Sequence, residues 1–316
     1  MHFSPLRFTI PLLLTMGIVF FGFVAEAEEL DSWYANSMDW SIEPFEKPAE
    51  AARSYLRRAR AYLHEKEPAA ALLYLYEALD KDPDRGVLLL YMGYAHLRLK
   101  ELDKAIDCFV RASRVAPRDA QAFRYAGRCH ELAGRLEPAI DWSLDALLRS
   151  PGDERLWTDL DRLARRTGRT LRRRPIHKRA LVRRNEDGEF SILIERREED
   201  PVAMAWLSYA ATRARWVSDL YLKFFPESED YRHTFREESE AWKAMVTTWR
   251  EMKQSDPQLV DADLDRVADL EARGLLDGYI FVEEFDSPFA EEEMAVISHP
   301  AARRYLREVV LDVQRD

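Results

Sequence analysis

The densest group of side chains that could do chemistry lies in residues 162–184, which read RLARRTGRTLRRRPIHKRALVRR. Eleven of these residues are Lys or Arg and none is acidic. Such a stretch can bind anionic lipid headgroups or the phosphates of nucleic acid, pair with acids of its own chain, or remain a solvated face. Residues 185–316 carry 31 acidic and 16 basic side chains, so counter-charge is available internally. We favour the internal or solvated interpretation, keep an anionic membrane surface as an alternative, and expect no nucleic acid partner.

The remaining titratable residues match no familiar catalytic pattern. The sequence has no GxSxG, no glycine-rich phosphate loop and no HExxH. His233 and His299 stand singly among carboxylates, and the acidic cluster Glu283, Glu284 and Asp286 lacks the spacing of a calcium loop. We interpret that cluster as solvated acids on a helical surface. We therefore expect no enzyme, metal or cofactor, with an unrecognised active site in residues 185–316 as the alternative.

The elements that position these groups are expected to be helical. The chain has 316 residues, enough for two domains, and its 47% hydrophobic content argues against wholesale disorder. Only eleven residues are glycine and a third are charged, which favours helices over a turn-rich β protein.

Three successive blocks of 34 residues, 52–85, 86–119 and 120–153, repeat the same small residues and prolines. Position 8 holds Ala59, Gly93 and Gly127, position 20 holds Ala71, Ala105 and Ala139, position 27 holds Ala78, Ala112 and Ala146, and position 32 holds Pro83, Pro117 and Pro151. This pattern strongly resembles the tetratricopeptide repeat. The resemblance implies a helix–turn–helix in each block, with positions 8 and 20 in contact where the helices cross, and an α-solenoid built by stacking. Ser143 replaces the usual bulky residue at position 24, so we expect a rotated second helix in the third block.

The resemblance also implies a binding surface, because the first helices of such repeats line a concave groove. Side chains expected to be exposed there are Arg53, Arg57, Arg60, Tyr91, Tyr94, Arg98, Arg124, Tyr125, Arg128 and Arg162. Arginine binds carboxylates in a two-pronged geometry, and tyrosine offers rigid amphipathic area. The hypothesis is therefore an acidic peptide ligand, ending in a free carboxylate in one version. The alternative is that the arginines only solubilise the helices and the tyrosines pack.

Four further residues in the repeats invite a chemical interpretation. His96 and His130 share column 11, and packing is favoured over a metal site because adjacent first helices lie about 10 Å apart. Cys108 and Cys129 fall on facing helices of neighbouring blocks. They could form a disulfide in an exported protein, and are otherwise small buried hydrophobes.

The rest of the chain divides into a leader and an α-rich half. Residues 1–27 read as a signal peptide cleaved after Ala27, or an uncleaved anchor, and 28–51 as a lead-in segment. A capping helix completes the repeats to residue 168, and 169–184 form a basic linker. In the C-terminal domain, 185–316, we expect a β-hairpin near 177–197 and helices near 201–225, 228–255, 261–273, 288–295 and 299–314. Residues 275–286 are expected to be a strand or an extended segment.

These expectations combine into one functional hypothesis. The chain is predicted to be predominantly all-α and exported, in the periplasm of a bacterium or tethered there. It is predicted to be an adaptor that holds an acidic or extended segment of another envelope protein. The alternatives are an enzyme or enzyme subunit and a membrane-surface scaffold that uses residues 162–184.

Overall fold

The computed structural model describes residues 48–83, 85–184, 190–195, 200, 202–228, 231–284 and 299–313. The predicted signal peptide, most of the lead-in and the predicted helix at 288–295 lie outside these residues. Residues from Pro48 onward form one compact unit. No described helix has both the length and the apolar sequence of a bilayer-spanning segment.

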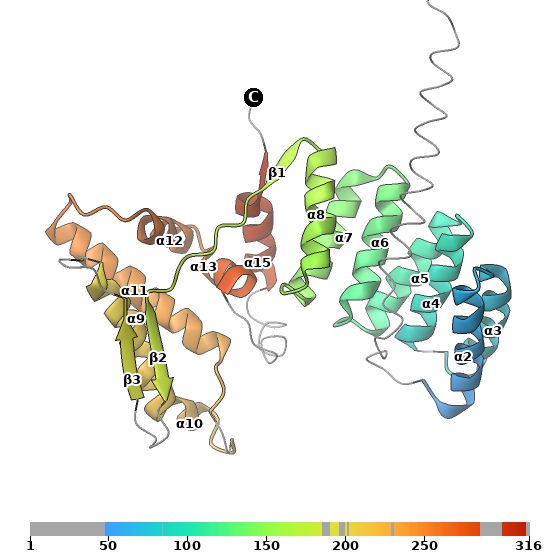
Figure 1. The fold of residues 1–316 in the computed structure, drawn as a ribbon, viewed down its shortest axis with the longest axis horizontal. Coiled ribbons are helices and arrows are strands. Elements are labelled where there is room, and N and C mark those ends of the chain that lie inside the picture. The colour runs from blue at the N-terminus through green and yellow to red at the C-terminus, as the bar shows by residue number, and fades with distance from the viewer. Residues whose placement is uncertain are drawn as a thin grey trace, which may run out of the picture. The chain divides into compact units, whose positions relative to one another are not determined.

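Seven helices follow the predicted blocks and lie side by side in Figure 1. They are α2 (Glu50–His64), α3 (Pro68–Lys81), α4 (Gly86–Arg98), α5 (Leu102–Val115), α6 (Ala120–Leu132), α7 (Leu136–Arg149) and α8 (Glu154–Arg166). The turns repeat as well, because Lys66, Lys100, Gly134 and Gly168 all have φ between 60° and 72°. Successive members of this set are separated by one block length. The positive φ at Gly168 marks α8 as the first helix of a fourth block, which continues as a strand instead of a second helix.

Small residues let the two helices of a block approach closely. A Cβ added at Gly93 would lie 2.5 Å from the Phe109 ring, and one added at Gly127 would lie 3.2 Å from the Ala139 carbonyl oxygen. The expected contact between positions 8 and 20 is therefore seen in the third block. Ser143 faces Gly127 as Phe109 faces Gly93, so the rotated second helix expected from Ser143 is wrong.

Two small antiparallel sheets follow the repeats. Strands β2 (Ala180–Arg184) and β3 (Phe190–Ile194) form the predicted hairpin. Strands β1 (Arg169–Leu171) and β4 (Leu311–Val313) pair with each other, although the whole C-terminal half separates them in the sequence. The sequence does not predict this pairing. The last predicted helix, 299–314, therefore ends early and continues into β4.

The C-terminal half is mainly helical. Its described helices are α9 (Ala203–Arg215), the π-helical turn η1 (Trp216–Leu220), α10 (Tyr221–Phe224), α11 (Phe235–Ser255), α12 (Ala262–Ala272), α13 (Leu276–Tyr279), the π-helical turn η2 (Ile280–Glu284), α15 (His299–Tyr305) and the π-helical turn η3 (Leu306–Val310). Residues 276–284 are helical, so the expected strand or extended segment there is wrong. A Cβ at Gly278 would lie 2.4 Å from the Ala301 carbonyl oxygen, which shows how closely α13 approaches α15.

Aromatic rings form the core of this half. Trp206, Tyr209, Trp242, Tyr279 and Tyr305 are almost completely buried. Successive rings meet edge to face with centroids 5.6–5.9 Å apart, an arrangement that stabilises aromatic pairs beyond their burial. The aromatic core of this half is therefore formed jointly by α9, α11, α13 and α15.

Candidate functional site

The predicted groove residues lie on the first helices α2, α4, α6 and α8, and contacts run from each helix to the next. The Arg60 guanidinium lies 5.8 Å from the centre of the Tyr91 ring, which joins α2 to α4. The Tyr94 hydroxyl donates to Gln121 Oε1 at 3.2 Å, and the Tyr94 and Tyr125 rings lie 4.4 Å apart, which joins α4 to α6. The structure therefore places these residues along one face of successive first helices.

The three tyrosines are buried, which corrects the expectation that they are exposed. Tyr91, Tyr94 and Tyr125 are 7%, 2% and 1% exposed. Phe109 of α5 packs edge to face against Tyr94 and stacks on Tyr125, with ring centroids 5.6 and 5.5 Å apart. Burial, and then the neighbouring Tyr125, raises the pKa of Tyr94 well above its usual value. The packing alternative therefore describes these tyrosines.

The arginines near the N-terminal end of the face differ from the tyrosines. Arg53 and Arg57 are exposed, whereas Arg60 and Arg98 are half-buried. Arg53 Nε donates to the Pro48 carbonyl oxygen at 2.9 Å. Contact of the ten predicted groove residues with a peptide stays a prediction.

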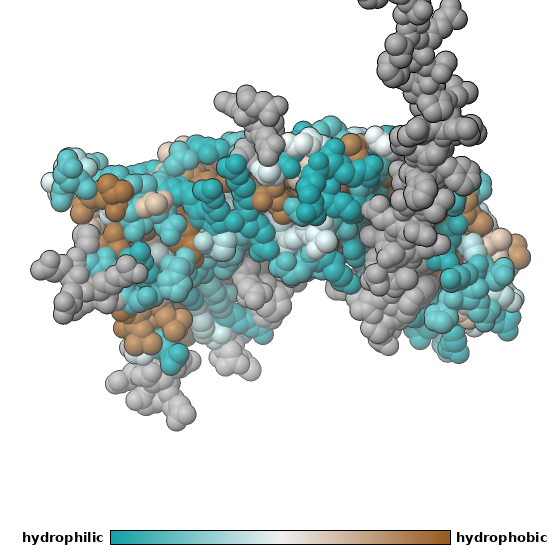
Figure 2. Space-filling view, turned by 45° about the horizontal axis from the view of Figure 1, so that its top comes forward, coloured by the Kyte–Doolittle hydropathy of each residue, from teal (hydrophilic) through white to brown (hydrophobic). Residues whose placement is uncertain are grey.

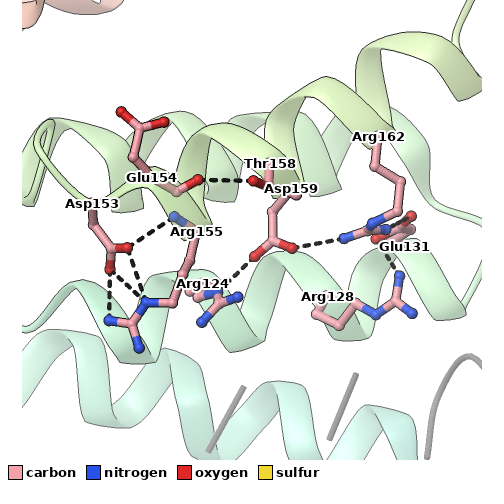
Figure 3. A network of polar contacts seen from close by, with 9 residues as sticks. All are labelled: Arg124, Arg128, Glu131, Asp153, Glu154, Arg155, Thr158, Asp159 and Arg162. Atoms are coloured by element: carbon pink, nitrogen blue, oxygen red, sulfur yellow. Dashed lines mark hydrogen bonds and ion pairs between the residues drawn. The ribbon is translucent and has the colours of Figure 1, made fainter. Parts of the chain in front are cut away.

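At the other end of the face, arginines and carboxylates form a network between α6 and α8 (Figure 3). Arg124 Nε donates to Asp159 at 2.6 Å, and Arg162 donates to the other oxygen of Asp159 at 3.1 Å. Arg162 also donates to Glu131, which accepts from Arg128 at 2.8 Å. Arg128 and Glu131 are 4% and 1% exposed, so the correction on exposure extends to Arg128. The network holds adjacent first helices together.

The network carries more positive than negative charge. Arg166 also donates to Glu131, at 2.9 Å, so four guanidinium groups share two carboxylates. Burial raises the pKa of Glu131, but Arg128 and Arg162 outweigh burial and hold this pKa below its usual value. Glu131 is therefore ionised at neutral pH, and these four arginines and two carboxylates together have a net charge of about +2.

Both carboxylates of this network were missed from the sequence, although a signal for them exists. Glu131 follows Arg128 by three residues and Asp159 precedes Arg162 by three, so each acid lies on the same helix face as its arginine. The prediction of an arginine-lined groove took into account only the cations of that face. The acids at the same helical spacing predict the pairs of Arg128 with Glu131 and of Arg162 with Asp159.

The basic stretch 162–184 is largely paired within the molecule. The pairs are Arg162 with Glu131 and Asp159, Arg165 with Asp161, Arg166 with Glu131, Arg169 with Glu137, Arg173 with Glu154 and Glu283, Lys178 with Glu238 and Glu284, and Arg179 with Asp200 and Asp261. This supports the internal interpretation, although several partners lie in the repeats instead of the acidic second half.

His96, His130 and the two cysteines of the repeats are packing residues. His96 is buried with Nδ1 2.6 Å from Glu101, and His130 stacks on Trp142 with ring centroids 6.5 Å apart. Cys108 and Cys129 are buried free thiols, so the considered disulfide is wrong. Burial raises the pKa of Cys108 to about 11 and that of Cys129 to about 12, which keeps both thiols protonated and unreactive.

A second polar cluster surrounds Glu238 at the start of α11. Its Oε1 accepts from Lys178 Nζ at 2.7 Å, the Tyr209 hydroxyl at 2.8 Å and Trp242 Nε1 at 2.9 Å, and its Oε2 lies 2.9 Å from His233 Nε2. Burial raises the pKa of Glu238, but His233 and Lys178 outweigh burial, so the pKa lies far below its usual value. The buried carboxylate thus ties the basic linker to α9 and α11.

The acidic cluster near residue 284 is not a solvated surface, which corrects that interpretation. The side chain of Glu283 is fully buried and bonds Arg173 and the Tyr305 hydroxyl, both at 3.4 Å. Glu284 accepts from the Ile176 amide at 3.0 Å and from the Tyr279 hydroxyl. Asp286 and the side chain of His299 lie outside the described residues.

Comparison with known proteins agrees with the repeat geometry. Residues 42–85 and 90–154 match the family model described as tetratricopeptide repeat. The chain contains tetratricopeptide repeats. The comparison with curated proteins found no match.

Several solved structures resemble part of the chain. The first repeat domain of Spaghetti (RPAP3) bound to the HSP90 peptide SRMEEVD is 18% identical, covers 38% of this chain and 98% of its own, and has a TM-score of 0.37. The second repeat domain of human RPAP3 with the HSP70 peptide SGPTIEEVD is 20% identical, with coverages of 37% and 98% and a TM-score of 0.35. MamA is 20% identical, with coverages of 37% and 68% and a TM-score of 0.36. Each covers less than two fifths of this chain.

Proposed function

We propose that the tetratricopeptide repeats bind a partner protein and that the first-helix face holds an acidic, extended segment of it. The observation that carries this proposal is the surplus of arginine on that face. Arg124, Arg128 and Arg162, drawn in Figure 3, and Arg166 share the carboxylates of Glu131 and Asp159. Helix α2 adds the exposed Arg53 and Arg57. Carboxylates of a partner would bind such an arginine-rich face through charge-assisted hydrogen bonds.

The role of the two ends of the face differs in this proposal. Arg124 and Arg162 already hold α6 to α8, and Arg128 pairs with Glu131 within α6. These three arginines therefore supply a fixed positive field more than individual contacts. Arg53 and Arg57 are exposed and supply adaptable contacts. The buried tyrosines keep the helices of the face at a fixed spacing.

We also propose that the chain is exported and that its partner is an envelope protein. This rests on the apolar run and the Ala25-Glu26-Ala27 pattern of residues 1–27. The N-terminal sequence of the protein purified from cells tests it. A mature protein that begins at Glu28 supports export, and a cytoplasmic protein that retains residue 1 contradicts it.

A charge-matched pair of variants tests the binding proposal. Arg53→Glu with Arg57→Glu changes the first-helix face, whereas Arg111→Glu with Arg114→Glu changes two exposed arginines of the second helix α5. Binding of a fluorescent peptide of glutamates, measured against the same peptide made of glutamines, is the readout. The first variant should lose glutamate-specific binding while the second retains it. Equal loss in both variants, or equal affinity for both peptides in the unmodified protein, contradicts the proposal.

A further inference from the structure

The β2–β3 hairpin has two edges, and they differ in chemistry. In the register of the hairpin, Val182 lies opposite Ile192, and Leu181 lies opposite Leu193. The Glu195 amide donates to the Arg179 carbonyl oxygen at 2.7 Å. Hydrogen-bonded pairs alternate along an antiparallel ladder, so residues 191, 193 and 195 bond β2. The backbone amides and carbonyls of residues 190, 192 and 194 therefore point away from β2, along the outer edge of β3.

This outer edge lacks the usual protection against strand pairing. Edge strands in natural proteins are guarded by charged residues, prolines or bulges. Strand β2 ends in Arg183 and Arg184, whereas β3 reads FSILI and has no charge, proline or glycine. Between described residues, no hydrogen bond outside the hairpin uses the main chain of Ile192 or Ile194. Strand β3 thus has the composition of a strand that pairs on both sides.

Exposed apolar side chains concentrate in the segment from β2 to the end of α10. Among described residues, eight of twelve large exposed hydrophobic side chains fall between residues 181 and 225. They are Leu181, Ile192, Leu193, Met204, Leu207, Leu222, Phe224 and Phe225. Figure 2 shows brown patches on the part of the surface formed by α9 to α12. Scattered single hydrophobics are normal on a monomer, but such a concentration indicates an interface.

We propose that β3 pairs with β3 of a second copy of this chain and forms a four-stranded antiparallel sheet. With Ile192 opposite its own counterpart, residue 190 faces residue 194 of the other copy. All three outward-pointing residues then meet outward-pointing residues, which satisfies every edge amide and carbonyl of both strands. This symmetry favours a second copy of the chain as the partner of the β3 edge, because the same edge on two copies is self-complementary.

Proline at matched positions on the two edges tests this proposal. Ile192→Pro removes an outward amide of β3 and leaves its bonds to β2 intact. Val182→Pro makes the same change directly opposite, on the edge guarded by arginines. Sedimentation of the full chain should show a dimer whose dissociation constant rises at least about tenfold in Ile192→Pro and changes little in Val182→Pro. A wild-type monomer, or equal dissociation constants in the two variants, overturns the proposal.

Hydrogen exchange gives a second measurement that needs no variant. The amides of Ile192 and Ile194 should exchange more slowly as protein concentration rises, while the amides of α12 are unaffected. Association should also strengthen with salt, because each copy has a net charge of −10. Exchange at these two amides that is independent of concentration overturns the proposal, as does protection that requires a different protein.

Discussion

Arg303 of α15 donates to Asp145 and Asp141 of α7 at 2.7 and 2.8 Å, across about half of the chain. Asp141 also accepts from Arg307. Together with the pairing of β1 with β4, these bonds fasten residues 299–313 to the third repeat and to the strand that follows α8. The repeats and the C-terminal half are thus joined by one set of contacts.

Reversing the charge of Arg303 tests this attachment. Arg303→Glu places a third carboxylate beside those of Asp141 and Asp145. We expect a loss of about 1 kcal/mol in the free energy of unfolding, since such partly exposed pairs each contribute little. Faster hydrogen exchange in residues 299–313 should accompany the loss. The control is Arg304→Glu, which changes a neighbouring exposed pair with Glu308. Equal exchange in the two variants would contradict a specific role for Arg303.

The Arg–Glu network between α6 and α8 should depend strongly on Glu131. Glu131→Gln removes the carboxylate charge that pairs with the buried Arg128, and we expect a loss of about 2–4 kcal/mol in the free energy of unfolding. Urea denaturation measures it. The matched control is Glu137→Gln, whose exposed pair with Arg169 should be worth less than about 1 kcal/mol. A loss at Glu131 no larger than at Glu137 would show that the network does not stabilise the fold.

Acid should destabilise the protein through these carboxylates. The pKa of Glu131 and of Asp141 is lowered in the fold, in each case because arginines outweigh the effect of burial. A lowered folded pKa gives stability that is complete above the unfolded values near about 4 and is lost as pH falls through the folded pKa. The free energy of unfolding should therefore fall below about pH 5. The decline should be shallower in Glu131→Gln, and an identical decline would refute the assignment.

The close helix crossing in the second block should not tolerate a methyl group. In Gly93→Ala the new Cβ would overlap the Phe109 ring, and we expect a loss of about 1–3 kcal/mol in thermal or urea denaturation. Gly152→Ala is the control, because no atom lies within 4 Å of the position that its new Cβ would take. We expect its stability to stay within about 1 kcal/mol of the original. Similar losses in both variants would mean that the crossing is looser than the geometry indicates.

The repeats were predictable from sequence because their contacts are local and recur. A glycine at position 8 and a proline at position 32 each have a physical reason that acts within one block. The recurrent positive φ at Lys66 and Lys100 was missed because lysine gives no sign of it.

The remaining features depend on distant partners that no local pattern reveals. Strand β1 has three residues and pairs with a segment about 140 residues later. The acids of residues 276–284 looked solvated because the sequence does not show Arg173 or Ile176 beside them. Likewise, the groove arginines were identified without the acids that neutralise part of their charge.

Photocrosslinking tests acidic-segment binding by the first-helix face, the central claim, most directly. A photoreactive benzoylphenylalanine replaces Arg57 on α2 or, as the control, Arg111 on α5, and the crosslinked peptides are sequenced by mass spectrometry. We predict that position 57 captures an acidic segment of a partner protein and that position 111 does not. Equal capture from both positions, or capture of segments without excess acid, would contradict the claim.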